Sequence, residues 1–346
     1  MSALKTPLLV LTDPRCALHD AGSGHPERPA RLQFALDAVD EAKALRSSGL
    51  RVIDRLNPAQ ESLLTLAHTT GYVKKILGME GSSTILDPDT RIGPHSIEAA
   101  RIATQGTLEA VRAVISNDVD GAVCLARPPG HHAESARAMG FCVFNSAAVA
   151  AAAALAYHDR RHVLILDLDV HHGNGTQEIF YECADVLYVS LHQYPWYPWS
   201  SGSASETGKD AGKGHTVNVP LPVGCGDPEY VLAMEEIVLP LIRAWGPDLV
   251  IISAGFDAHE TDPLGGMKLS ASGWQDLFGR LFRLLHELDI PWAATLEGGY
   301  TEKAIRDGMA ALLQPATPKL LAPELPMEKA LTSIYMARRL CPFLGS

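Results

Sequence analysis

The chain has 346 residues, of which 47% are hydrophobic and 20% are charged, and this is enough apolar material for a large core. Its 29 basic and 40 acidic residues give a formal net charge of −11. This balance argues against a protein that grips nucleic acid through the phosphate backbone. None of the six cysteines belongs to a CxxC pair, which is typical of reduced thiols in a cytoplasmic protein rather than of a disulfide framework.

The chain carries no obvious targeting or membrane segment. Its first apolar run reaches Asp13 and Pro14 too soon to be the core of a signal peptide. The longest uninterrupted apolar stretch, residues 147–157, is too short to span a bilayer and is rich enough in alanine to be a buried helix. We therefore expect a soluble protein without a membrane span.

Seven short apolar runs, separated by longer helical patterns, predict buried strands. Because nearly every position in a run is apolar, both faces of the sheet must be covered by helices. This predicts a mostly parallel sheet in a three-layer α/β/α arrangement. No linker or repeat interrupts the alternation, so we expect one domain over residues 1–346. The runs cover residues 8–13, 121–126, 162–169, 186–192, 215–221, 248–255 and 291–299.

Two segments between these runs have a clear helical pattern. Residues 227–245 and 270–289 carry apolar side chains at spacings of three and four, which is typical of helices that bury one face. Pro240 should kink the first of them. Two long segments without such a pattern, 14–29 and 193–214, are expected to be functional or disordered loops.

Polar side chains stand at the ends of four predicted strands, which is where parallel sheets bind ligands. Asp169 and His171 lie two positions apart, so on an extended strand they point the same way. Asp257, at the end of another strand, would complete an open site of one histidine and two carboxylates. This set suits Zn²⁺, although Fe²⁺ accepts the same kinds of ligand.

Two neighbouring histidines, His131 and His132, follow a rigid Pro-Pro-Gly turn. They could be incidental residues of a surface loop, but a hydrolytic metal site needs a base and imidazole titrates near neutral pH. Asp167 and Asn174 are candidate partners for the two rings. Because an amide adds no charge, the histidine facing Asn174 is easier to keep neutral. Tyr300, after two glycines, could donate a hydrogen bond to an oxyanion or simply pack in a turn.

Several segments in a fixed order resemble the motifs of the histone deacetylase family, which has the arginase–deacetylase fold. The segments are RPPGHHA (127–133), GFCVFN (140–145), DLDVHHGNGTQ (167–177), VSLHQYPWYP (189–198), GFDAHETDPLGG (255–266) and LEGGY (296–300), and the resemblance begins at HPERPARL (25–32). Asn174 stands where class I members carry Asp, so the chain is similar to class II members and bacterial histone deacetylase-like amidohydrolases. The resemblance implies Zn²⁺ held by Asp169, His171 and Asp257, a catalytic pair His131 and His132 with Asp167 and Asn174 as partners, and Tyr300 polarising the acyl carbonyl.

The resemblance also implies a substrate tunnel. Phe141 and Tyr197 correspond to its two aromatic walls, beside Gly140. Leu264 corresponds to a rim position that is acidic in the polyamine-selective deacetylase, so its apolar side chain counts against that specificity. Tyr197 lies in a loop with Trp196 and Trp199 that could be either the tunnel rim or a contact in a homo-oligomer.

Further positions follow from the same resemblance. Asp87 is expected to clamp a substrate backbone amide, with Asp89 as a close alternative, and Arg28 to line an exit route for the released acid. A structural monovalent cation, K⁺, is implied beneath the zinc. Its ligands would be Asp167, Ser190 and the carbonyls of Asp169, His171 and Leu191.

The predicted function is zinc-dependent removal of acetyl or other short acyl groups from the ε-amine of lysine, in a peptide, a protein or a small acylated amine. An acetylpolyamine amidohydrolase is the nearest alternative because it shares the zinc and catalytic residues. Arginase-like chemistry needs paired acids for a second metal, whereas Asp257 is followed by Ala258 and His259. A catalytically silent protein that binds acyl-lysine is the alternative outside enzymes.

Overall fold

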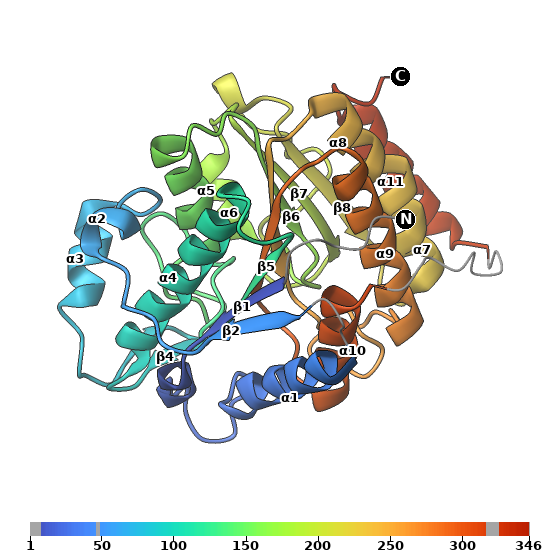
Figure 1. Cartoon of the computed structure of the whole chain (residues 1–346). Coiled ribbons are helices and arrows are strands. Elements are labelled where there is room, and N and C mark those ends of the chain that lie inside the picture. The colour runs from blue at the N-terminus through green and yellow to red at the C-terminus, as the bar shows by residue number, and fades with distance from the viewer. Residues whose placement is uncertain (1–7, 46–48, 316–324, 346) are drawn as a thin grey trace.

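The computed structural model describes residues 8–45, 49–315 and 325–345, and its centre is an eight-stranded sheet (Figure 1). The strand order is β2-β1-β5-β10-β9-β6-β7-β8, and each neighbouring pair is parallel. Each of the seven predicted runs contains a strand, which confirms the mostly parallel sheet. The strands are β1 (Leu8–Thr12), β2 (Leu50–Ile53), β5 (Ala122–Leu125), β6 (Val163–Asp167), β7 (Val186–Gln193), β8 (Thr216–Leu221), β9 (Leu249–Ala254) and β10 (Trp292–Leu296).

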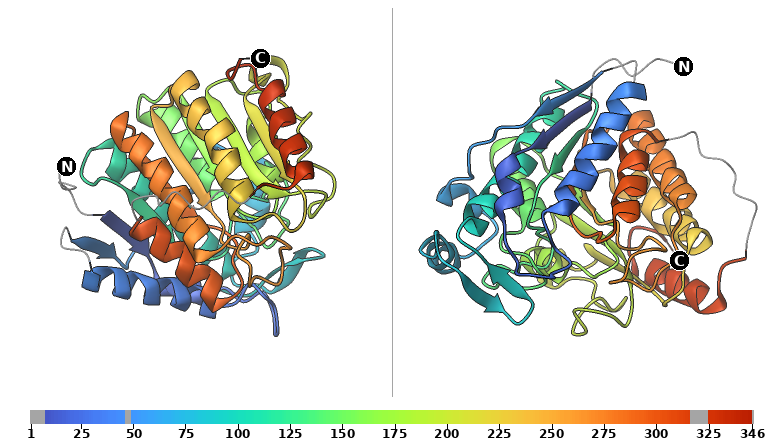
Figure 2. Two further views of the ribbon diagram at one scale, coloured as in Figure 1. Left: turned by 90° about the vertical axis from the view of Figure 1, so that its right-hand side faces the viewer. Right: turned by 90° about the horizontal axis from the view of Figure 1, so that it is seen from below.

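Helices cover both faces of the sheet, so the predicted three-layer α/β/α architecture is confirmed. One face is covered by α4 (Ser96–Ile115), α5 (Ser146–Tyr157) and α6 (Asn174–Phe180), and on the other the remaining long helices lie in a row (Figures 1 and 2). Most buried apolar residues form one large cluster between these layers, and a second, smaller cluster includes Tyr72, Ile92 and Phe144. The helices of the row are α1 (Ala30–Leu45), α10 (Glu302–Leu313), α9 (Ala271–Glu287), α7 (Asp227–Ala233), α8 (Leu239–Trp245) and α11 (Glu328–Leu340).

The helix predicted over 227–245 is interrupted rather than simply kinked. A π-helical segment, Met234–Val238, separates α7 from α8. Pro240 then lies in the first turn of α8, directly after the π segment, and has no backbone N–H to donate to the preceding turn. The extra residue per turn in the π segment therefore accommodates the proline without ending the helical rod.

The sequence patterns did not reveal the strands outside the buried part of the sheet. The edge strand β2 has Val52 half-buried between the exposed side chains of Arg51 and Ile53, so it lacks a continuous apolar run. A separate antiparallel hairpin is formed by β3 (Thr84–Asp87) and β4 (Thr90–Ile92). Two short helices, α2 (Glu61–Leu64) and α3 (Thr70–Leu77), precede this hairpin.

The described residues contain no helix that is both long and apolar enough to cross a membrane. All six cysteines lie in the described part of the chain, and none forms a disulfide there. The apolar run that was judged too short for a signal peptide forms β1 from Leu8 onward, and residues 1–7 lie outside the described residues.

The topology brings four loops to one place. Because all strands of the sheet run parallel, their carboxyl ends meet at one edge, and β5, β10, β9 and β6 are consecutive neighbours at the centre. The loops that follow these four strands carry the paired histidines, Tyr300, Asp257 and Asp169 with His171. The segments that resemble the deacetylase motifs therefore converge.

Candidate active site

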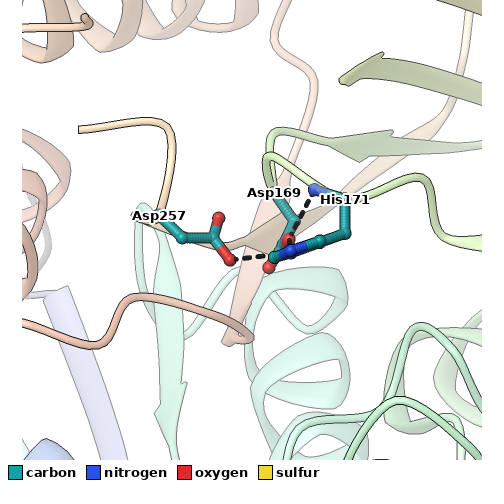
Figure 3. A group of neighbouring side chains, drawn as sticks. All are labelled: Asp169, His171 and Asp257. Atoms are coloured by element: carbon teal, nitrogen blue, oxygen red, sulfur yellow. Dashed lines mark hydrogen bonds and ion pairs between the residues drawn. The ribbon is translucent and has the colours of Figure 1, made fainter. Parts of the chain in front are cut away.

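Asp169, His171 and Asp257 form a buried group that could hold a metal ion. One potential ligand atom from each side chain lies within 4.8 Å of the others. Figure 3 shows Asp257 approaching from its own loop, opposite Asp169 and His171. The Nδ1 atom of His171 is 3.0 Å from an oxygen of Asp169 and 3.1 Å from an oxygen of Asp257. This imidazole nitrogen and the two carboxylates therefore face a common point.

The convergence of Asp169 and His171 does not come from a strand, as the alternating pattern had suggested. Strand β6 ends at Asp167, and both residues belong to the loop that follows. This loop folds around the carboxylates through backbone N–H groups. The His171 N–H donates to Asp169 at 2.9 Å, and the Val170 N–H donates to Asp257 at 2.8 Å. The same backbone that carries two of the ligands thus orients the third.

Two glycines let the backbone pack directly against these carboxylates. The Gly298 N–H donates to Asp169 at 2.8 Å. A Cβ atom at Gly298 would collide with the carboxylates of both Asp257 and Asp169, and one at Gly255 would collide with Asp169. Larger residues at either position would displace a candidate ligand.

The electrostatics of this group favour a bound cation. Burial raises the pKa of Asp257, and the neighbouring Asp169 raises it further. Although burial opposes its charge, hydrogen bonds to the two carboxylates raise the pKa of His171 to about 10. Without a metal the site therefore retains protons at neutral pH, and a divalent cation that binds there must displace them.

The paired histidines have different partners. The Nδ1 atom of His131 is 3.1 Å from an Asp167 oxygen, whereas the Nδ1 atom of His132 is 2.8 Å from the side-chain oxygen of Asn174. Burial opposes charge on His131, but the carboxylates of Asp169 and Asp167 raise its pKa well above the usual value. Burial and the neighbouring His131 lower the pKa of His132 well below it. The pair therefore offers one charged and one neutral imidazole.

Tyr300 is buried and held by contacts that do not use its hydroxyl. The Arg31 guanidinium lies 4.8 Å from the centre of its ring, the Phe141 ring is 6.0 Å away, and its backbone N–H donates to Asp262 at 2.6 Å. Burial raises the pKa of Tyr300 well above its usual value, so the phenol keeps its proton. It can therefore act as a hydrogen-bond donor.

The arginine beneath Tyr300 is Arg31 and not Arg28. Arg28 is exposed at the surface, and its role in an exit route for the released acid stays a prediction. Helix α1 begins at Ala30, and this places Arg31 in the first turn facing inward, where it pairs with Glu27 at 2.9 Å. Its guanidinium also donates to the carbonyls of Glu297 and Gly299.

The two aromatic residues assigned to the tunnel contact different catalytic candidates. Phe141 packs on Tyr300, whereas the Tyr197 ring is 5.1 Å from the His132 ring. Gly140 has a φ of +56°, and a Cβ atom there would collide with His132. Residues 140–145, which carry the predicted tunnel wall Phe141, are called the tunnel loop. Glycine at position 140 lets this loop pack against the histidine.

The residues predicted at the rim of the tunnel make specific hydrogen bonds and ion pairs. The Leu264 carbonyl accepts a hydrogen bond from the Trp196 indole N–H at 2.9 Å. Asp87 forms an ion pair with Arg137 at 3.0 Å, whereas Asp89 accepts the Gly140 N–H at 3.1 Å. Of the two acids, Asp89 is thus the one that contacts the tunnel loop directly.

The residues assigned to the monovalent cation lie behind the metal group. Asp167 and Ser190 are partners in the register of β6 and β7, and both are fully buried. Asp167 also accepts the Tyr188 hydroxyl at 3.0 Å, and Ser190 is hydrogen-bonded to His192 at 2.9 Å. Leu191 follows on the same strand.

The long loop 193–214 is tied to the interior by histidines. His172 does not join the metal group, because its ring lies 2.8 Å from the Ser201 hydroxyl and 3.1 Å from Gln177. His192 is hydrogen-bonded to the Gly202 carbonyl at 2.9 Å. These contacts fix the segment that carries Tyr197.

Sequence reasoning missed several residues that support the site. Glu297 accepts the N–H groups of Gly130 and His131 at 2.6 and 3.1 Å, which holds the turn before the paired histidines. Glu134 accepts a hydrogen bond from the Asn174 amide at 2.9 Å. Glu297 lies inside the segment 296–300, and Glu134 directly follows the segment 127–133. Their position next to catalytic candidates was the available signal.

Comparison with known proteins gives consistent matches. The histone deacetylase domain family matches residues 25–315. A probable deacetylase of Archaeoglobus fulgidus is 36% identical over 284 residues, which are 82% of this chain and 78% of the archaeal one. A polyamine deacetylase of Homo sapiens is 36% identical over 347 residues, which are 95% of this chain and 50% of the human protein. The crystal structure of an HDA15 HD domain has a TM-score of 0.87 and 34% identity, covering 98% of this chain and 96% of that one.

Proposed function

Because the chain belongs to the histone deacetylase family, we propose that it is a zinc-dependent amidohydrolase that removes acetyl or other short acyl groups from the ε-amine of lysine. The family makes it a hydrolase of amide bonds. The identities of the metal as zinc and of the substrate as acyl-lysine are our own proposals. The observation that carries the proposal is the metal group of Asp169, His171 and Asp257 beside one neutral and one charged histidine.

The donor set fits a zinc ion. One imidazole and two carboxylates are common zinc ligands and leave coordination positions open for water and substrate. Among the residues that the structure describes, this is the one group of three or more possible ligands, which favours a single metal over an arginase-like pair. A zinc ion bound there would polarise the acyl carbonyl and a water molecule.

The surrounding side chains can carry the proton transfers. His132 is neutral and would take a proton from the attacking water. The Tyr300 hydroxyl would donate a hydrogen bond to the oxyanion that develops on the acyl oxygen when water attacks the acyl carbon. His131 carries a positive charge stabilised by Asp167 and would act mainly electrostatically. An imidazolium would finally protonate the leaving lysine amine.

Several contacts support acyl-lysine as the substrate. The walls Phe141 and Tyr197 suit the neutral, extended stem of an acylated lysine. We assign the clamp for a substrate backbone amide to Asp89, since it contacts the tunnel loop at Gly140. The apolar Leu264 at the rim offers no charge to a polyamine, which carries several positive charges.

The polyamine alternative retains one specific observation in its favour. The human relative that aligns with 95% of this chain is named a polyamine deacetylase. This chain spans half of that protein, and the human name alone does not assign a substrate. The proposal therefore needs a direct comparison of the two substrate classes.

We extend the proposal to a structural K⁺ held by Asp167, Ser190 and the carbonyls of Asp169, His171 and Leu191. Asp167 is fully buried, and a buried carboxylate is costly without compensating positive charge. The charge of His131 is shared between this carboxylate and Asp169, so a monovalent cation near Asp167 would supply the positive charge that the two acids still lack.

The test measures turnover of an acetyl-lysine peptide, of the same peptide with longer acyl chains, and of N-acetylspermidine. The protein is treated with a chelator and then reloaded with Zn²⁺ or Fe²⁺. We expect activity that disappears on chelation, returns with Zn²⁺, and has a higher kcat/KM on the peptide. A higher kcat/KM on N-acetylspermidine would favour the polyamine alternative. Absence of metal-dependent turnover on every substrate would contradict the proposal and favour a silent binding protein.

A further inference from the structure

The carboxylate of Glu134 lies next to the residue that contacts the proposed base. Its Oε1 atom accepts a hydrogen bond from the Asn174 side-chain Nδ2 at 2.9 Å. On its other side, Asn174 presents Oδ1 to the Nδ1 atom of His132 at 2.8 Å. The three side chains therefore form a short chain of hydrogen bonds from a half-buried acid to a buried imidazole.

The neighbours of Asn174 decide which way its amide points. A carboxylate can only accept hydrogen bonds, and so can a thioether sulfur. The Nδ2 atom faces both kinds of group, because the Met139 sulfur lies 3.3 Å away in addition to Glu134. Turning the amide over would direct its oxygen at these two acceptors and lose both hydrogen bonds. The amide oxygen must therefore face His132.

The orientation of the amide in turn decides where His132 carries its proton. An oxygen 2.8 Å from Nδ1 requires a proton on Nδ1. The lone pair of the neutral ring is then on Nε2. The ring cannot turn to escape this arrangement, because it is packed between the His131 ring at 4.0 Å, the Tyr197 ring at 5.1 Å and the backbone of Gly140.

We propose that Glu134 is a positioning residue that, through the Asn174 amide, holds His132 in the tautomer with its proton on Nδ1 and its lone pair on Nε2. The inference rests on the proposed function, in which His132 is the base. In this role Glu134 does not contact the substrate. Its effect is to keep the lone pair available for the attacking water.

Glu134 is itself held in place on both sides of its backbone. Its N–H donates to the Arg137 carbonyl at 2.9 Å, and its carbonyl is 3.0 Å from Nδ1 of His68. These contacts are independent of the carboxylate. A substitution of the side chain therefore removes the contact to Asn174 while leaving the backbone anchors.

The test replaces the acceptor by a donor. In Glu134→Lys the ammonium can only donate, so it favours an Asn174 amide turned over, with its NH₂ group toward His132. We expect kcat to fall by about tenfold or more with KM near the wild-type value. Glu134→Gln, which keeps an acceptor, should lose less. In the double variant Glu134→Lys, Asn174→Asp, the new carboxylate accepts from both neighbours and the lysine ammonium offsets its charge on His132, so most of the lost turnover should return.

The matched control is Glu178→Lys. Glu178 accepts hydrogen bonds from the backbone and hydroxyl of Ser135 at 2.8 and 2.9 Å, next in the chain to Glu134. The substitution makes the same reversal of charge close to Glu134, from helix α6, and changes no side-chain contact of Asn174. We expect kcat to remain within about twofold of the wild type.

A second measurement reports on the tautomer itself. In protein labelled with ¹⁵N in the histidine rings, the wild-type His132 should show a protonated Nδ1 and an unprotonated Nε2, and Glu134→Lys should shift the population toward a protonated Nε2. An unchanged tautomer in Glu134→Lys, wild-type kcat in that variant, or a loss that Asn174→Asp does not reverse would each overturn the inference. The tautomer does not depend on turnover, so failure of the proposed function would be recognised separately, by a wild-type protein that hydrolyses no acyl-lysine.

Discussion

Replacing Tyr300 with phenylalanine removes one hydroxyl and leaves the other contacts of the residue in place. The ring is held by Arg31 at 4.8 Å and Phe141 at 6.0 Å, and the backbone N–H by Asp262 at 2.6 Å. None of these contacts uses the hydroxyl. Tyr300→Phe should therefore fold as the wild type does and hold its metal with the same affinity.

The expected loss in kcat is that caused by removing one hydrogen-bond donor to an oxyanion. Removing such a donor from a buried site lowers kcat by about 10²–10³, which corresponds to about 3–4 kcal/mol. Burial raises the pKa of Tyr300 well above its usual value, so the donor is present at all physiological pH. We expect the loss in kcat and little change in KM, since the hydroxyl bonds the oxyanion more strongly than the ground-state carbonyl.

The assay compares kcat and KM on an acetyl-lysine peptide, bound metal and thermal unfolding for Tyr300→Phe and for a second tyrosine variant. Tyr72 is buried, and its hydroxyl donates to the Val143 carbonyl at 2.6 Å. Tyr72→Phe should therefore lose about 1 kcal/mol of stability and keep its kcat. Turnover of Tyr300→Phe within about threefold of the wild type would refute the role of the hydroxyl.

Two further predictions concern the histidines. His132→Ala should lower kcat by about 10²–10⁴, and more than His131→Ala, because the neutral ring is the base; the opposite order in steady-state kinetics would assign the base to His131. Metal affinity should rise with pH, by about tenfold per unit for each proton displaced, since His171 in the metal-free site has a pKa of about 10 and is protonated below it. Asp257, whose pKa is also raised, adds to this slope at lower pH. Competition with a chromophoric chelator between pH 6 and 8 measures the slope, and a flat response would contradict the prediction.

The buried strands of the fold were predictable because burial on both faces leaves a continuous apolar run. The residues of β9, Leu249–Ala254, are buried at every position and were recognised. The edge strand β2 was not, because its side chains alternate between half-buried and exposed. The hairpin of β3 and β4 was missed for the same reason, since several of its side chains face solvent.

The site was predictable to the level of residue identity but not of geometry. The residue types at strand ends predicted the metal group, although Asp169 and His171 converge through loop hydrogen bonds and not through a shared strand face. The inward position of Arg31 depends on where α1 begins, and sequence fixes a helix start only to within a few residues, so Arg31 was not singled out. Contacts such as Glu134 with Asn174 join segments 40 residues apart and required the folded chain.

The position of the site in the sheet affects which parts of the protein unfold first. The loops of the site follow β5, β10, β9 and β6, which are the four central strands, whereas β2 and β8 form the edges. Exchange of backbone amide hydrogens with solvent is slowest where opening requires the largest cooperative unit to unfold. The edges can therefore detach in partial unfolding while the central strands remain paired. We expect the anchors of the metal group to be among the most slowly exchanging amides of the chain, with the half-buried strand β2 among the first to exchange.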